Sequence, residues 1–80
     1  MKLPRDLDGR GLAGALRSLG YETTRQNGSH MRLTTQQGGE HHVTIPNHAA
    51  LRVGTLAGIL ADVAEHFGIS RDELLDQLFG

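Results

Sequence analysis

Cysteine and tryptophan are absent from this 80-residue sequence, and aromatic residues make up only 4% of it. Without cysteine, the chain can form neither disulfide bonds nor thiolate metal sites. With so few aromatic rings, leucine, isoleucine and valine must fill the interior, and a chain of this length buries only one modest core. The composition therefore excludes a multidomain enzyme and a disulfide-stabilised secreted domain, and predicts one domain over residues 1–80.

Long apolar runs are also missing. No segment approaches the roughly 20 apolar residues that a membrane-spanning helix requires. The N-terminal stretch MKLPRDLDGR carries charges and a glycine where a secretory signal peptide would be apolar. We therefore expect a cytoplasmic protein that does not associate with membranes.

Charge is distributed unevenly, although the net charge is only −1. Residues 1–52 carry a formal charge of +3 and four of the five histidines, whereas residues 53–80 carry −4. A basic segment joined to an acidic one suits a protein that meets phosphate groups on one side only. Small domains often show such imbalances, so the asymmetry alone does not establish nucleic-acid binding.

Periodicity and turn signals divide the chain into six elements. Leucines at helical spacing predict a helix over 9–19, with Asp6 or Asp8 as its cap. The pair Asn27-Gly28 predicts a hairpin between two threonine-rich strands. Ser70 and Glu73 have the spacing of a capping box before a last short helix. The predicted elements are a helix over 9–19, strands over 21–26, 29–35 and 40–45, a helix over 56–67 capped by Thr55, and a helix over 71–79.

This order predicts an α+β fold with an α-β-β-β-α two-layer arrangement and a short extra C-terminal helix. The three strands form an antiparallel meander, and both long helices cover one face of it. The other face is then left to water or to a ligand. This uncovered face is called the outer face below.

Side-chain alternation predicts which residues occupy the outer face. If the apolar residues of the second and third strands point inward, then His30, Arg32 and His42 point outward. The first strand is ambiguous. A two-residue turn at Asn27-Gly28 pairs Arg25 with His30 and places Arg25 on the outer face, but it also turns Tyr21 outward; a three-residue turn would reverse the strand. We favour the arrangement that places Arg25 near His30.

Histidine is the one side chain on this face suited to proton transfer near neutral pH. A histidine beside arginines can act as general acid or base on a phosphodiester, and RNA supplies its own nucleophile in the 2′-hydroxyl. A solvated surface histidine without function gives the same pattern. A zinc site formed by His41, His42 and His48 is a further alternative, but adjacent strand residues point to opposite faces. We therefore expect no metal site and no cofactor.

Several short motifs resemble the HicA toxin family, also called YcfA-like. The resemblance extends from about Lys2 to Phe79, and the order and distances of the motifs make it more specific than any one of them. The motifs are Gly20-Tyr21-Glu22, Arg25-Gln26-Asn27-Gly28-Ser29-His30, Ile45-Pro46-Asn47-His48, and Gly54-Thr55-Leu56 with Ile59-Leu60.

The resemblance implies a fold like that of a double-stranded-RNA-binding domain, with one HicA-like domain over residues 1–80. It implies an mRNA interferase, a metal-independent endoribonuclease toxin of a type II toxin–antitoxin pair, with a HicB-type antitoxin as partner. We expect the free protein to be a monomer and the complex with antitoxin to be a hetero-oligomer. A non-catalytic RNA-binding or regulatory module of the same fold is the alternative.

The family motif Gly-Ser-His falls on Gly28, Ser29 and His30, so the resemblance implies that His30 is the catalytic residue. Gly28 would serve the geometry of the backbone, and Ser29 would place a hydroxyl or amide near the phosphate. His48 matches a recurrent family position, where an RNA contact and a role in loop structure both remain open. The sequence thus predicts an RNA-binding surface formed by Arg25, Gly28, Ser29, Arg32 and His48 around His30.

Overall fold

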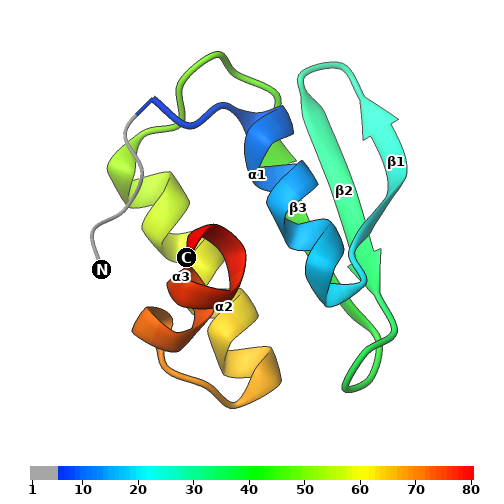
Figure 1. Cartoon of the computed structure of the whole chain (residues 1–80). Coiled ribbons are helices and arrows are strands. Elements are labelled where there is room, and N and C mark those ends of the chain that lie inside the picture. The colour runs from blue at the N-terminus through cyan, green and yellow to red at the C-terminus, as the bar shows by residue number, and fades with distance from the viewer. Residues whose placement is uncertain (1–5) are drawn as a thin grey trace.

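The computed structural model describes residues 6–80 and has the predicted order of elements (Figure 1). A short helix is continued by one 3₁₀ turn, three strands follow, and two helices complete the chain. The elements are α1 (Gly9–Leu16), η1 (Arg17–Leu19), β1 (Glu22–Asn27), β2 (His30–Thr35), β3 (His41–Pro46), α2 (Val53–Phe67) and α3 (Arg71–Phe79). The fold is α+β, consistent with the arrangement of a double-stranded-RNA-binding domain.

The strands form one antiparallel sheet in the order β1-β2-β3, and the helices lie together on one side of it (Figure 1). Burial alternates along β2 and β3, as expected for a sheet with one covered face. Met31, Leu33, Val43 and Ile45 point into the core, where they meet leucines of α1, α2 and α3. His30, Arg32, His42 and Thr44 are exposed on the outer face, which confirms the predicted alternation.

Helix boundaries follow local capping at two of the three helices. The Asp8 side chain accepts a hydrogen bond from the Gly11 amide and begins α1, and Ser70 with Glu73 forms the predicted capping box before α3. The predicted cap of α2 at Thr55 is wrong, because α2 already begins at Val53 and Arg52 is its N-cap residue. Leu51 donates a backbone hydrogen bond to the carbonyl oxygen of Leu7, and this contact with a distant segment fixes where the chain enters α2.

Within residues 6–80, the longest helix is α2, with 15 residues. None of the helices in this part of the chain combines the length and the apolarity needed to cross a bilayer.

The register between β1 and β2 differs from the predicted one. Asn27 pairs with His30, so the two-residue turn consists of Gly28 and Ser29, and Arg25 pairs with Arg32 instead of His30. Gly28 takes the first turn position with a φ of 61°, a left-handed conformation that glycine adopts without steric cost. Asn27, which the sequence places in the turn, therefore remains part of the strand.

A β-bulge in β1 resolves the conflict over Tyr21. The register shifts between Thr23 and Arg25, so the residues before the bulge and the residues after it can face opposite sides of the sheet as their polarity requires. Arg25 lies on the outer face beside Arg32, whereas Tyr21, just before the strand, is fully buried at 0% exposure. The predicted face of Arg25 is thus retained although its predicted partner is not.

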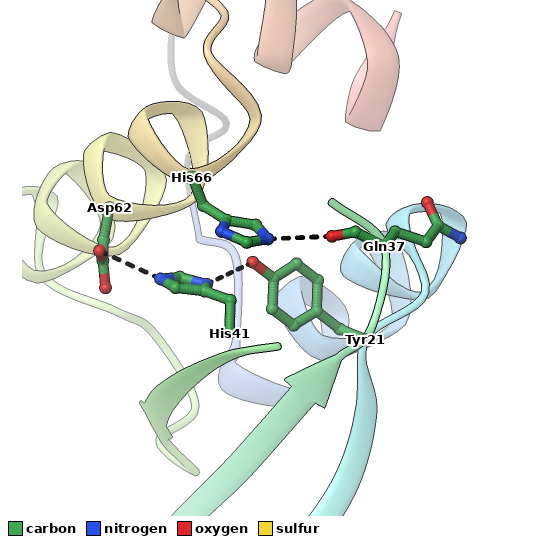
Figure 2. A network of polar contacts seen from close by, with 5 residues as sticks. All are labelled: Tyr21, Gln37, His41, Asp62 and His66. Carbon is green, nitrogen blue, oxygen red and sulfur yellow. Dashed lines mark hydrogen bonds and ion pairs between the residues drawn. The ribbon is translucent and has the colours of Figure 1, made fainter. Parts of the chain in front are cut away.

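Tyr21 anchors a polar network that joins the sheet to α2 (Figure 2). Its hydroxyl lies 2.7 Å from His41 Nδ1, and His41 Nε2 lies 3.3 Å from Asp62 Oδ1. The Asp62 carboxylate only accepts, so Nε2 donates to it, and Nδ1 of the neutral ring accepts from the tyrosine. His66 stacks on His41 with ring centroids 4.4 Å apart and donates from Nε2 to the Gln37 carbonyl oxygen. The network fastens the turn between β2 and β3 to α2.

The ionisation of Tyr21 is expected to reveal this burial directly. Burial, with a further contribution from the nearby Asp62 charge, raises the pKa of Tyr21 to about 12, compared with about 10 in an unfolded chain. The folded state therefore binds the proton more tightly. Its contribution to stability is complete below pH 10 and is lost as the pH rises through 12.

Tyr21 is the single tyrosine, so an ultraviolet absorbance titration reports it alone. Native protein should ionise near pH 12 and urea-unfolded protein near pH 10, with circular dichroism recorded in parallel. A phenol that titrates near pH 10 in folded protein would contradict the buried position of Tyr21.

Candidate active site and RNA interface

His30 is the first residue of β2 and lies on the exposed outer face, between Asn27 of β1 and Pro46 of β3. It lines a shallow depression of about 150 Å³. The residues around this depression are Arg25, Asn27, His30, Arg32 and Thr44. A histidine is therefore open to solvent and has two arginines in the same depression, as general acid–base chemistry on an anionic substrate would require.

Arg25 and Arg32 are directly opposite each other on neighbouring strands. Like charges in this position repel, and such pairs destabilise a sheet. Within residues 6–80, the carboxylate contacts on the sheet join Asp62 to His41 and Glu40 to His42, and neither arginine has a carboxylate within ion-pair distance. The depression thus concentrates two positive charges that a bound phosphate would neutralise, with bidentate geometry available from each guanidinium group.

A wider groove continues from this depression along the outer face. It has a volume of about 520 Å³ and shares Arg25 and Arg32 with the His30 depression. The remaining lining residues are polar: Thr24, Thr34, Gln36, Glu40 and His42. The two hollows together form a track that starts at His30 and follows β2 toward the turn before β3.

The turn at Gly28 and Ser29 is held against the segment that follows β3. The Asn47 amide donates a 2.6 Å hydrogen bond to the Ser29 carbonyl oxygen. Gly9 packs so closely on Pro46 that a β-carbon at position 9 would collide with the Pro46 carbonyl oxygen. These contacts fix the backbone beside His30.

The structure brings only some of the predicted site residues together. Arg25, Arg32 and His30 share one depression, and Gly28 and Ser29 form the adjoining turn. His48 is exposed but is not among the residues that line the depression. Its carbonyl oxygen accepts a 3.0 Å hydrogen bond from the Gly9 amide, so the observed contact of His48 is one of loop structure.

The five histidines do not converge. His41 points inward to Tyr21, while its neighbour His42 lies on the outer face beside Thr34, as the alternation of the strand predicts. Among the residues that the structure describes, no three or more histidine, aspartate or glutamate side chains are grouped so as to hold a metal ion. The chemistry available at the depression is therefore that of imidazole, guanidinium, amide and hydroxyl groups.

Two features of the site were missed by sequence reasoning. Thr24 of β1 lines the outer groove, and Asn27 lines the His30 depression. The richness of both strands in threonine was a signal for a polar face, but the bulge that turns Thr24 outward beside Arg25 could not be read from alternation.

Comparison with known proteins gives one match. The family model described as "HicA toxin of bacterial toxin-antitoxin" matches residues 9–64, which extend from the start of α1 through the whole sheet and most of α2. No match was found among curated proteins or among solved structures.

Proposed function

Because this chain belongs to the HicA toxin family, we propose that it is an endoribonuclease toxin that cleaves mRNA on the outer face, with His30 as general acid or base. The observation that supports this most strongly is the placement of exposed His30 in one depression with an opposed pair of arginines that have no carboxylate partner among residues 6–80. A proton-transfer group and cationic phosphate-binding groups both accelerate cleavage of a phosphodiester by an internal nucleophile.

The proposed reaction uses the ribose 2′-hydroxyl as nucleophile. The 2′-oxygen attacks the adjacent phosphorus while the bond from phosphorus to the 5′-oxygen of the next nucleotide breaks. The products are a 2′,3′-cyclic phosphate and a free 5′-hydroxyl. His30 removes the proton from the 2′-hydroxyl or supplies one to the departing 5′-oxygen, and water carries out the other of these two proton transfers. Arg25 and Arg32 bind the non-bridging oxygens, where negative charge increases in the transition state.

This mechanism assigns no step to a metal ion. Carboxylates are the protein ligands that Mg²⁺ prefers, and none lines the His30 depression in the described part of the chain. We therefore propose metal-independent cleavage with no cofactor.

Membership of this family also supports a proposal about the protein partner of the chain. The matching family consists of toxins of bacterial toxin–antitoxin pairs, so we propose that a HicB-type antitoxin binds this chain and covers the outer face. Such a pair acts in the cytoplasm, where mRNA is found. We further propose that residues 1–80 form one HicA-like domain, monomeric when free and hetero-oligomeric with the antitoxin.

The test of the proposed function is cleavage of RNA by purified protein in excess EDTA. We expect activity to persist and the 5′ fragment to end in a 2′,3′-cyclic phosphate or a 3′-phosphate, as detected by mass spectrometry. Cleavage that requires Mg²⁺ and leaves 5′-phosphate ends would contradict the mechanism. Binding of RNA without any cleavage would favour a non-catalytic RNA-binding module.

A further inference from the structure

Four side chains on the outer face are connected by one carboxylate–imidazole contact and two hydrogen bonds, at the end of the groove away from His30. Glu40 Oε2 lies 3.2 Å from His42 Nε2, and His42 Nδ1 lies 2.7 Å from Thr34 Oγ1. Thr34 Oγ1 lies in turn 3.0 Å from Thr24 Oγ1. These connected side chains extend from the loop before β3 across all three strands, and all four residues line the groove. These four residues are called the hydroxyl chain below.

The direction of each hydrogen bond follows from its neighbours. The Glu40 carboxylate can only accept, so its position 3.2 Å from Nε2 favours the His42 tautomer with the proton on Nε2, and in that tautomer Nδ1 accepts. Thr34 therefore donates its hydroxyl hydrogen to His42. Thr24 donates to Thr34 or to the Arg32 carbonyl oxygen 3.3 Å away, and in either case its hydrogen is used within the protein.

The hydroxyl chain therefore presents hydrogen-bond acceptors to the groove. The hydroxyl hydrogens of Thr24 and Thr34 are committed, while lone pairs on their oxygens and on the Glu40 carboxylate remain open. The bases differ in what they present to such a surface. Adenine at C6 and cytosine at C4 carry exocyclic amino groups, which are hydrogen-bond donors, whereas guanine and uracil carry carbonyl oxygens at the corresponding positions; the amino group of guanine is at C2, on the other side of its ring.

We propose that the hydroxyl chain recognises the exocyclic amino group of adenine or cytosine in single-stranded RNA, and so sets a base preference for cleavage. This inference rests on the proposed function, because it assumes that RNA follows the groove from His30. Thr34 lies about 13 Å from His30 along β2, from the rise of an antiparallel strand. The recognised base therefore belongs to a nucleotide that flanks the cleaved bond.

Donors are present elsewhere in the same groove. Arg25 and Arg32 lie at its His30 end, where they are assigned to phosphate, and the Gln36 amide can either donate or accept. The hydroxyl chain differs from them because its polarity is fixed by the carboxylate at one end. It is thus the part of the groove that can discriminate between a donor and an acceptor on a base.

The experiment compares RNA oligomers that differ only by the amino group. His30→Ala protein, used to prevent cleavage, is titrated with oligoadenylate and with the same oligomer in which purine riboside replaces adenosine. We expect adenosine to bind roughly three- to tenfold more tightly, the effect of one neutral hydrogen bond. Adding Thr34→Val, which removes the central hydroxyl but keeps the shape of the side chain, should abolish the difference. Thr55→Val, an exposed threonine of α2, is the matched control and should preserve it.

The outcomes separate this inference from the proposed function. Equal binding of the two oligomers, or a preference that survives Thr34→Val, overturns the inference. If the His30→Ala protein prefers the oligomer with the amino group but the wild-type protein cleaves no RNA, the inference is supported and the proposed nuclease function is overturned. Failure to bind either oligomer overturns the inference, while cleavage of RNA by the wild-type protein decides the proposed function separately.

Discussion

Replacing His30 with alanine is expected to lower RNA cleavage by about 10²–10⁴-fold, the usual contribution of a positioned general acid or base. Stability should change by only about 0.5 kcal/mol, because the side chain is exposed on the outer face and no core packing is lost. The measurements are single-turnover cleavage of a labelled RNA and urea unfolding of the same preparations. Expression in bacteria should no longer arrest growth.

His30→Gln distinguishes proton transfer from binding. A carboxamide can hydrogen-bond to a phosphate but cannot exchange a proton near neutral pH, so His30→Gln should be as inactive as His30→Ala while it binds RNA normally. Cleavage at the wild-type rate by folded His30→Ala protein would remove His30 from the mechanism.

Arg32→Ala and Arg25→Ala are expected to weaken RNA binding by about ten- to a hundredfold each, because each removes a charge-assisted contact to phosphate. Each lost contact should also reduce the slope of log K against log salt by roughly 0.7 on single-stranded RNA. Stability should stay constant or rise by a few tenths of a kcal/mol, since the arginines are opposed like charges without an ion pair in the described part of the chain. Affinity is measured in the His30→Ala background over a salt titration.

Arg71→Ala and Asp76→Asn are the controls for this series. Both residues are exposed on α3, in the helical layer on the other side of the molecule from the outer face (Figure 1). Neither change should alter the salt slope by a full phosphate contact. If the α3 variants change the slope while the Arg25 and Arg32 variants keep it, RNA binds the helical layer instead of the sheet.

The outer face could be predicted from the sequence because it depends on a local rule. Alternation in β2 and β3 places apolar residues inward, so the outward positions of His30, Arg32 and His42 follow once the strands are recognised. The helix caps at Asp8 and Ser70 were equally local. The resemblance to the HicA family then selected His30 among the histidines, which alternation alone could not do.

The partners of Arg25 and the start of α2 could not be predicted because they depend on contacts between distant segments. The burial of Tyr21 against His41 and the exposure of Arg25 are compatible only through a bulge in β1. The sequence of β1 alone does not indicate that bulge. In the same way, α2 begins early because Leu51 is held by Leu7. The hydroxyl chain depends on both the register and the bulge, which bring Thr24 beside Thr34, so alternation within a single strand could not predict it.

In the proposed complex, single-stranded RNA lies along the outer face with its reacting phosphate at His30. The most direct test is an NMR titration of ¹⁵N-labelled His30→Ala protein with a short single-stranded RNA. We expect the largest amide shift changes at Arg25, Ser29, Arg32 and His42, with α3 unaffected. Shift changes concentrated in α2 and α3, with no shift changes for amides of the outer face, would contradict this placement of the RNA.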